Sequence, residues 1–150
     1  MIYNYNLARA RLISETGGTL SDRPLIRFAT KPTWTIRFCA VSAGAVTALD
    51  VSDAVAWRAA VDRDHSTATE PMCRTLNDDV DQSAAASGEI SVPLDANTET
   101  FLAAVDGKES LSSWFELWGL DAAGEAIYYV KFPIWTGMPI DPASGEAPAA

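Results

Sequence analysis

Histidine and cysteine are scarce in this chain, which has one histidine, His65, and two cysteines, Cys39 and Cys73. One histidine and two separated cysteines do not make a zinc site, and the sequence has no CxxC pair. Two cysteines are too few for a disulfide framework; they either pair or stay free, and we expect free thiols in a reducing interior. Any Ser/His/Asp or Cys/His device must use His65, which lies in a polar stretch that we expect to be solvated rather than catalytic.

Motifs for nucleotides, hydrolysis, export and membrane insertion are also missing. The chain has no GxGxxG, no phosphate loop ahead of Gly107-Lys108 and no Gly-x-Ser-x-Gly, so we expect neither a cofactor nor an enzyme. No window approaches the roughly 18 apolar residues of a membrane span. The N-terminus, Met1–Asn6, lacks the basic start and the apolar run of a signal peptide.

Positive charge is in short supply as well. Twenty acidic residues face eleven basic ones, which gives a net charge of -9 and a pI near 4.4. A general nucleic-acid binder needs clustered positive charge for its phosphate contacts, so we expect no nucleic-acid partner.

The acidic stretch from Asn77 is the best candidate for a metal. A calcium loop has oxygen ligands at its first, third and fifth positions, glycine at the sixth and glutamate at the twelfth. Asn77, Asp79 and Asp81 meet the first requirement, but Gln82 and Gly88 occupy the sixth and twelfth positions. We therefore expect no metal site and favour a solvated acidic loop; Asp79 and Asp81 are the weak alternative for a looser oxygen site.

Apolar residues in strand-like alternation are what the chain does have. They make up 48% of the residues, enough for one core in a chain of this length. Alternation predicts strands over 3–13, 25–28, 33–41, 54–62, 72–76, 88–94, 113–120 and 126–135, with a mostly loop-like stretch over 62–87. The last two strands are joined by Asp121-Ala122-Ala123-Gly124, which suits a type I turn with a glycine bulge.

One short helix interrupts the strands. Asn97 or Thr98 can cap it, Glu99 complements its dipole, and Gly107 can end it. Beyond Gly137, prolines and small residues predict an extended Pro/Ala-rich tail over 137–150. The sum predicts a mainly β fold: a single β-sandwich domain over residues 1–136 with an N-terminal strand or arm, because one-sided apolar strands must face a second sheet.

The charge is divided unevenly along the chain. Residues 1–40 have a balance of +4 and residues 41–150 a balance of -13. Two interpretations stay open: the basic segment lies on the acidic remainder of its own fold, or a basic arm that includes Arg9 and Arg11 reaches an acidic neighbour.

Tryptophan is abundant, with five copies. Trp34 and Trp57 fall on expected inward faces, whereas Trp114 and Trp118 are four residues apart and share one side of their strand. Since the other side of that strand is also apolar, the strand is either central and covered twice or faces a partner. Trp114, Trp118 and Trp135 are thus candidate binding residues, for a subunit interface or for sugar stacking.

The order of these features resembles a known group. The segments are Thr33–Val41, Val55–Asp62, Gly88–Leu94 and Trp114–Trp135, followed by Met138-Pro139-Ile140-Asp141-Pro142. Together they resemble the immunoglobulin-like N-terminal domains of phage baseplate upper proteins and related tail-fibre proteins. The resemblance implies an immunoglobulin-like antiparallel β-sandwich with structural and adhesive roles, usually as oligomers and without catalysis. The short helix and the added N-terminal strand depart from it, and no functional residues carry over.

The leading hypothesis is a non-enzymatic structural or attachment module of a phage tail, baseplate or prophage particle. It would bind other copies of itself or neighbouring tail proteins, and would reside in the virion, or in the bacterial cytoplasm before assembly. The second hypothesis is a carbohydrate-binding module that recognises a cell-surface glycan. A third is an enzyme of unrecognised type that uses a metal held by acidic residues such as Asp62, Asp64, Asp78, Asp79 or Asp81.

Overall fold

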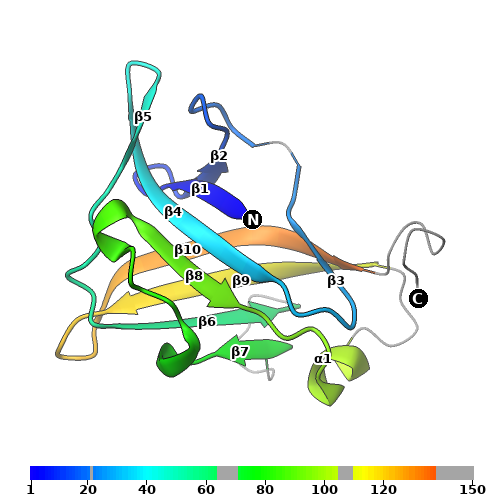
Figure 1. Ribbon diagram of the computed structural model, residues 1–150. Helices are drawn as coiled ribbons and strands as arrows, with labels where there is room; N and C mark the ends of the chain where they lie inside the picture. The colour runs from blue at the N-terminus through cyan, green and yellow to red at the C-terminus, as the bar shows by residue number, and fades with distance from the viewer. Residues whose placement is uncertain (21, 64–70, 105–109, 138–150) are drawn as a thin grey trace.

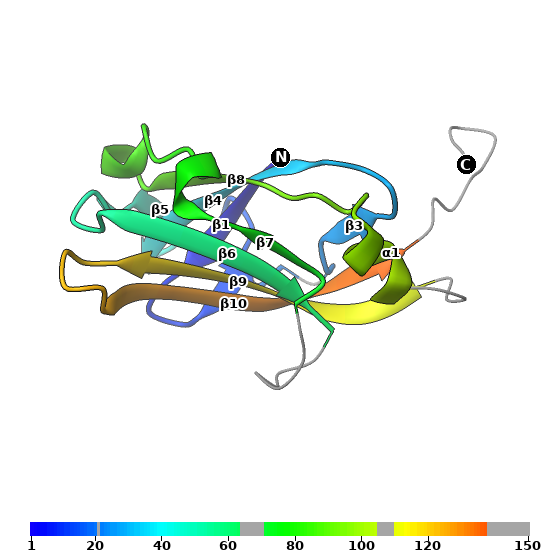
Figure 2. The same cartoon turned by 90° about the horizontal axis from the view of Figure 1, so that it is seen from below.

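The computed structural model describes residues 1–20, 22–63, 71–104 and 110–137, which build two packed sheets (Figure 1). Sheet A contains β1 (Ile2–Asn6), β2 (Arg11–Ile13), β4 (Thr33–Ser42), β5 (Ala45–Ala48) and β8 (Glu89–Pro93). Sheet B contains β3 (Leu25–Arg27), β6 (Ala56–Asp62), β7 (Cys73–Thr75), β9 (Ser110–Leu120) and β10 (Ala126–Gly137). Figure 2 shows β4 and β8 on one side of the molecule and β9 and β10 on the other.

The strand order confirms the predicted mainly β sandwich with one short α-helix, α1 (Glu99–Ala104). Sheet A has the order β2-β1-β4-β5, with β8 paired to the first half of β4, and sheet B has the order β3-β10-β9-β6-β7. Six pairings are antiparallel, but β1–β4 and β10–β3 are parallel. The expectation of an antiparallel sandwich is therefore wrong for these two pairs, and immunoglobulin-like connectivity stays a prediction.

The core between the sheets is largely aromatic. Period-two alternation places Trp34 of β4 opposite Phe115 of β9, with ring centroids 5.5 Å apart, and Phe115 lies 5.0 Å from Phe132 of β10. Trp57 of β6 is fully buried and stacks on Tyr128 with an interplanar angle of 8°. The inward placement predicted for Trp34 and Trp57 is confirmed.

The N-terminal segment differs from the prediction of one strand over 3–13. The strand ends at Asn6, whose Oδ1 accepts a hydrogen bond from the Arg9 backbone N–H, and the chain returns as β2. Asparagine favours such turns because its side chain bonds its own backbone neighbours. β1 lies inside sheet A between β2 and β4, so residues 2–6 are a structural strand rather than a detached arm.

Three further elements, one strand and two short 3-10 turns, were not predicted. The strand β5 pairs with the end of β4 through a two-residue turn, Ala43-Gly44, in which both φ angles are positive. The loop-like stretch contains the predicted short strand β7 and two single 3-10 turns, η1 (Asn77–Asp79) and η2 (Ala85–Ser87). Both turns lie at the end of the sandwich where β6 begins (Figure 1).

The helix and the last hairpin follow their sequence signals. Thr98 Oγ1 accepts a hydrogen bond from the Phe101 N–H at 3.1 Å, which confirms Thr98 as the N-cap. In the hairpin, Asp121 Oδ1 accepts from the N–H of Ala123 and of Glu125. The expected helix end at Gly107 lies outside the described residues, as does the predicted tail beyond Gly137, which ends β10.

Candidate functional site: the aromatic face of sheet B

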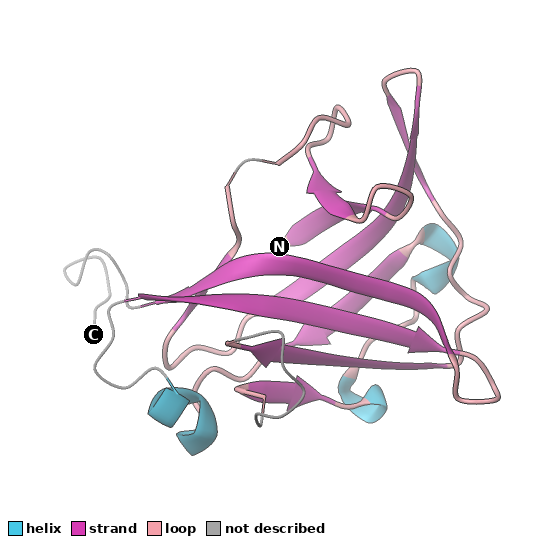
Figure 3. Cartoon of the chain, turned by 180° about the vertical axis from the view of Figure 1, so that it is seen from behind, coloured by secondary structure: helices cyan, strands magenta, loops and turns pink. Residues whose placement is uncertain are grey.

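The outer surface of sheet B gathers aromatic and basic side chains. Along β9, Phe115 and Leu117 point into the core, so that Trp114, Glu116 and Trp118 point outward. Figure 3 views the molecule from this side, with β10, β9 and β6 side by side. We define the aromatic face by the residues of sheet B and its border that share this side: Arg23, Arg58, Asp62, Arg74, Trp114, Glu116, Trp118, Tyr129, Lys131, Pro133 and Trp135.

Strand register arranges these side chains in rows. Tyr129, Trp118 and Arg58 are cross-strand partners, and the rings of Tyr129 and Trp118 lie 5.8 Å apart. The next row pairs Lys131 with Glu116. Opposed side chains in neighbouring strands contact one another directly, so the face is a continuous surface rather than a set of isolated residues.

A cation lies over the ring of each of the three outward tryptophans. The Arg23 guanidinium is 4.7 Å from the Trp135 ring centroid and that of Arg58 is 5.9 Å from Trp118. Lys131 Nζ lies 5.1 Å from the Trp114 ring. Arg23 also donates from Nη1 to Ser112 Oγ at 2.8 Å. Cation–π contacts stabilise such exposed pairs modestly, by about 0.5–1 kcal/mol each, and orient the rings.

The charge of the face opposes that of the whole chain. Among the described residues of the face, the four cations of Arg23, Arg58, Arg74 and Lys131 exceed the two carboxylates, while the chain as a whole carries -9. One of the carboxylates, Glu116, accepts a hydrogen bond from the Tyr129 hydroxyl. The face is therefore locally basic, and its aromatic rings include Tyr129 and Trp135, which are 43% and 41% exposed.

Carboxylates beside two tyrosines alter their ionisation. The hydroxyl of Tyr128 donates to Asp53 Oδ1 at 2.5 Å, and this bond, with burial and the nearby negative charge, raises the pKa of Tyr128 to about 12. Burial and the bond to Glu116 raise the pKa of Tyr129 as well. Burial also raises the pKa of Tyr5, which lies in the core, and of Tyr3, which packs against it.

An alkaline titration tests this arrangement. Since the pKa of all four tyrosines is raised from 10.0 in the folded chain, the stability linked to them is present below pH 10 and is lost as pH rises toward 12. We expect the phenolate absorbance of the native chain to rise only above pH 10. In denaturant, the phenolate absorbance should rise at a pH near 10. Tyr128→Phe should remove one late phenol; a native titration that matches the denatured one would contradict the assignment.

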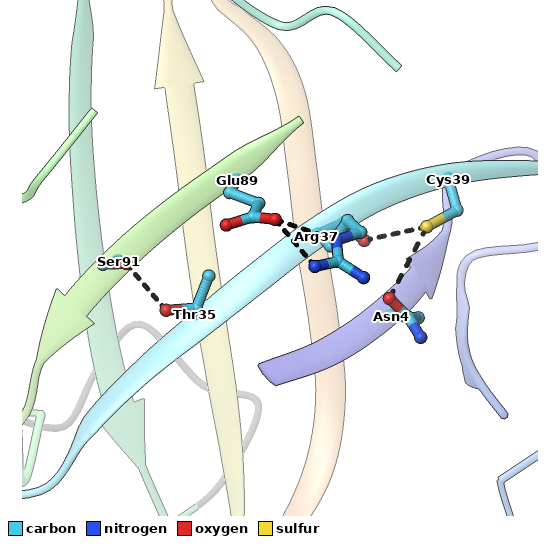
Figure 4. Close-up of polar contacts among 6 residues, drawn as sticks. All are labelled: Asn4, Thr35, Arg37, Cys39, Glu89 and Ser91. Atoms are coloured by element: carbon cyan, nitrogen blue, oxygen red, sulfur yellow. Dashed lines mark hydrogen bonds and ion pairs between the residues drawn. The ribbon is translucent and has the colours of Figure 1, made fainter. Parts of the chain in front are cut away.

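The outer face of sheet A is different, because its polar groups are paired with one another (Figure 4). Arg37 of β4 and Glu89 of β8 form an ion pair at 2.7 Å, and the hydroxyls of Thr35 and Ser91 are 2.7 Å apart. The thiol of Cys39 donates to the Arg37 carbonyl at 3.4 Å, and burial raises its pKa. Two faces of one sandwich therefore differ in character, and the aromatic face is the candidate binding surface.

The structure places the predicted site residues as follows. Trp114, Trp118 and Trp135 lie together on the aromatic face, on adjacent strands. The strand that holds the first two is central in its sheet, and its inner side packs in the core. Arg9 lies in the turn after β1, and Arg11 begins β2 at the edge of sheet A.

Of the two candidate metal residues, Asp79 ends η1 and Asp81 follows it two residues later. Asp79 is exposed, and Asp81 Oδ1 accepts hydrogen bonds from the N–H and hydroxyl of Ser83, which lower the pKa of Asp81. Over residues 1–20, 22–63, 71–104 and 110–137, no group of three histidine, cysteine or acidic side chains is placed to hold a metal ion. His65 and Asp64 lie outside these ranges.

Sequence reasoning did not identify the basic residues of the face as site residues. Arg58 and Lys131 each occupy an outward position of an alternating strand, but only the register shows that they neighbour Trp118 and Trp114. Arg23 precedes β3, and its contact with Trp135 depends on the parallel pairing of β3 with β10. Alternation alone indicates the side of each residue; it does not indicate which strands are adjacent.

A hollow of about 610 Å³ lies elsewhere, between the edge of β7 and the start of α1. Lys31 and Asp95 face each other across part of it at 3.8 Å, and the thiol of Cys73 lies beneath. Burial raises the pKa of Cys73 to about 11, so this thiol is a poor nucleophile at neutral pH. Both cysteines are free and buried, as expected.

No protein-family model matches the chain, and a search of curated proteins finds no match. In the part of the chain that the structure describes, no helix is long and apolar enough to cross a membrane.

Proposed function

We propose that this chain is a non-enzymatic structural or attachment module of a phage tail, baseplate or prophage particle that docks on a protein partner through the aromatic face. The observation that carries the docking role is the row of tryptophans on one sheet face, each with a cation over its ring. Tryptophan, tyrosine and arginine dominate the hot spots of protein interfaces. The particle context rests on the resemblance of the order of sequence features to the immunoglobulin-like domains of phage baseplate upper and tail-fibre proteins.

The cations favour a protein partner over a sugar. A sugar ring stacks on the open face of an aromatic ring, and the cations above Trp114, Trp118 and Trp135 compete for that position. A protein surface that carries carboxylates can instead contact the cations and the ring edges together. The partner that fits the face is thus a protein surface with acidic and apolar side chains.

Association with particles tests the proposal. Particles released from the bacterium that carries the gene are separated on a density gradient and assayed for the chain. We expect the wild-type chain in the particle fraction and the double variant Arg58→Gln, Trp118→Ala outside it, because hot-spot truncation weakens binding by about 30-fold or more. The matched control is Thr47→Ala, at an exposed position of β5 in sheet A.

Two outcomes would contradict the proposal. The first is absence of the wild-type chain from the particles. The second comes from tryptophan fluorescence measured against a panel of glycans: a saturable shift that disappears in Trp118→Ala would assign the face to a sugar. We expect no shift with any glycan.

A further inference from the structure

One end of the sandwich is strongly acidic. Three segments that connect strands meet there, and two hydrogen bonds join them. The Val55 backbone N–H donates to the Leu120 carbonyl at 2.8 Å, and the Trp57 backbone N–H donates to Asn77 Oδ1 at 2.8 Å. These contacts join the start of β6, the turn after β9 and the η1 turn at the left-hand end of Figure 1. We define the acidic end by its charged and apolar members: Asp50, Asp53, Val55, Leu76, Asp78, Asp79, Asp81, Asp121, Glu125 and Ile127.

The composition of this end is one-sided. The three ten-residue segments that form it, 48–57, 76–85 and 119–128, are described in full and contain seven acidic residues and no lysine, arginine or histidine. Three large apolar side chains are also exposed there: Val55 at 56%, Leu76 at 62% and Ile127 at 40%. Exposed apolar side chains that gather in one place with a polar rim are typical of a protein contact surface.

The acidic end and the aromatic face are opposite in charge and alike in apolar content. The face has four cations against two carboxylates and exposes Tyr129 and Trp135. Apart from their border at Ile127 and Tyr129, the two surfaces cannot meet within one chain, because one caps the ends of the strands and the other lies along their flat side. A second copy of the chain offers each surface its complement.

We propose that the acidic end of one copy docks on the aromatic face of a second copy. This inference rests on the proposed role of the aromatic face as a protein-docking surface. The contact joins two different surfaces, so each copy keeps one surface for a further neighbour unless the assembly closes. Attraction between the opposite charges assists association, and salt weakens it.

Sedimentation velocity of the full chain gives the first test. We expect the average mass to rise with protein concentration in dilute buffer and to fall when salt is added. A wild-type chain that stays monomeric at every concentration in dilute buffer would overturn the inference.

Two neutralising variants give the decisive test. The face variant is Arg58→Gln with Trp118→Ala, and the end variant is Leu76→Ser with Glu125→Gln, both at side chains that reach the surface. Each variant alone should self-associate at least about 30-fold more weakly than the wild-type chain. Their equimolar mixture should restore a one-to-one complex and nothing larger, because the intact end of the first docks on the intact face of the second.

The mixture also controls for folding, since a misfolded variant cannot restore the complex. Two monomeric variants that keep the circular dichroism spectrum of the wild type and do not combine would overturn the inference, as would unchanged association of either one. Thr47→Ala should match the wild type. The outcome is separable from that of the proposed function. If the wild-type chain is monomeric but binds particles, and the face variant does not bind them, the self-docking inference alone is wrong. If the chain self-associates but is absent from particles, the particle role alone is wrong.

Discussion

Replacing Trp57 with alanine is expected to lower the free energy of unfolding by about 3–5 kcal/mol, the range for truncating a large buried aromatic side chain. Trp57 is fully buried, stacks on Tyr128 at 5.9 Å and lies 5.6 Å from Phe38 of the other sheet. Its removal leaves a cavity between the sheets that the flanking strands cannot close. Denaturant unfolding followed by circular dichroism measures the loss.

Trp57→Phe is the matched control. No described residue accepts a hydrogen bond from the indole N–H of Trp57, so this buried donor costs about 1–3 kcal/mol that phenylalanine recovers. We expect Trp57→Phe to lose much less stability than Trp57→Ala. Equal losses would show that the ring does not fill the site.

Gly119 extends the test by a double-mutant cycle. A Cβ placed on Gly119 would lie 2.7 Å from the Trp57 ring, so Gly119→Ala should destabilise the wild type. In the Trp57→Phe background the smaller ring leaves room, and the cost of Gly119→Ala should fall. Additive effects of the two substitutions would contradict direct contact between these positions.

Much of the fold is predictable because strand alternation is a local property. Residues 33–41 alternate apolar and polar side chains, and β4 covers them; Asp121 and Gly124 mark the turn between β9 and β10. The failures occur where local signals are weak or shared. Residues 3–13 alternate throughout, so the pattern does not indicate the turn between Asn6 and Arg11. Ala43-Gly44 is not the Asn-Gly or Asp-Gly pair that is typical of a two-residue hairpin turn.

The candidate site divides along the same line. That Trp114 and Trp118 share a side follows from a spacing of four in one strand. The positions of Trp135, Arg23 and Arg58 beside them follow from the order β3-β10-β9-β6, which depends on long-range pairing. The uneven charge on the two sides of residue 40 does not indicate where a basic surface forms. The basic face of sheet B takes Arg23 from the first segment and Arg58 and Lys131 from the second.

Gly88→Ala is expected to destabilise the chain more than an alanine at another glycine of the same conformation. Gly88 has φ +80°, and a Cβ there would lie 2.6 Å from the Leu49 carbonyl oxygen and 2.9 Å from that of Phe38. The Phe38 carbonyl accepts from the Leu49 N–H, and the Gly88 carbonyl accepts from the Phe38 N–H, at 2.8 Å each. An added methyl group must displace backbone that holds β4 to the segments beside it.

Gly44→Ala is the control, because Gly44 also has φ +80° and its Cβ position is open. Both substitutions incur the cost of a left-handed residue, about 1–2 kcal/mol. Gly88→Ala adds the cost of forcing atoms into occupied space, about 1–3 kcal/mol more, because rigid backbone rather than a movable side chain stands in the way. Thermal or denaturant unfolding of the two variants measures the difference. Equal destabilisation would mean that the backbone at the start of β8 shifts to accommodate the added methyl group.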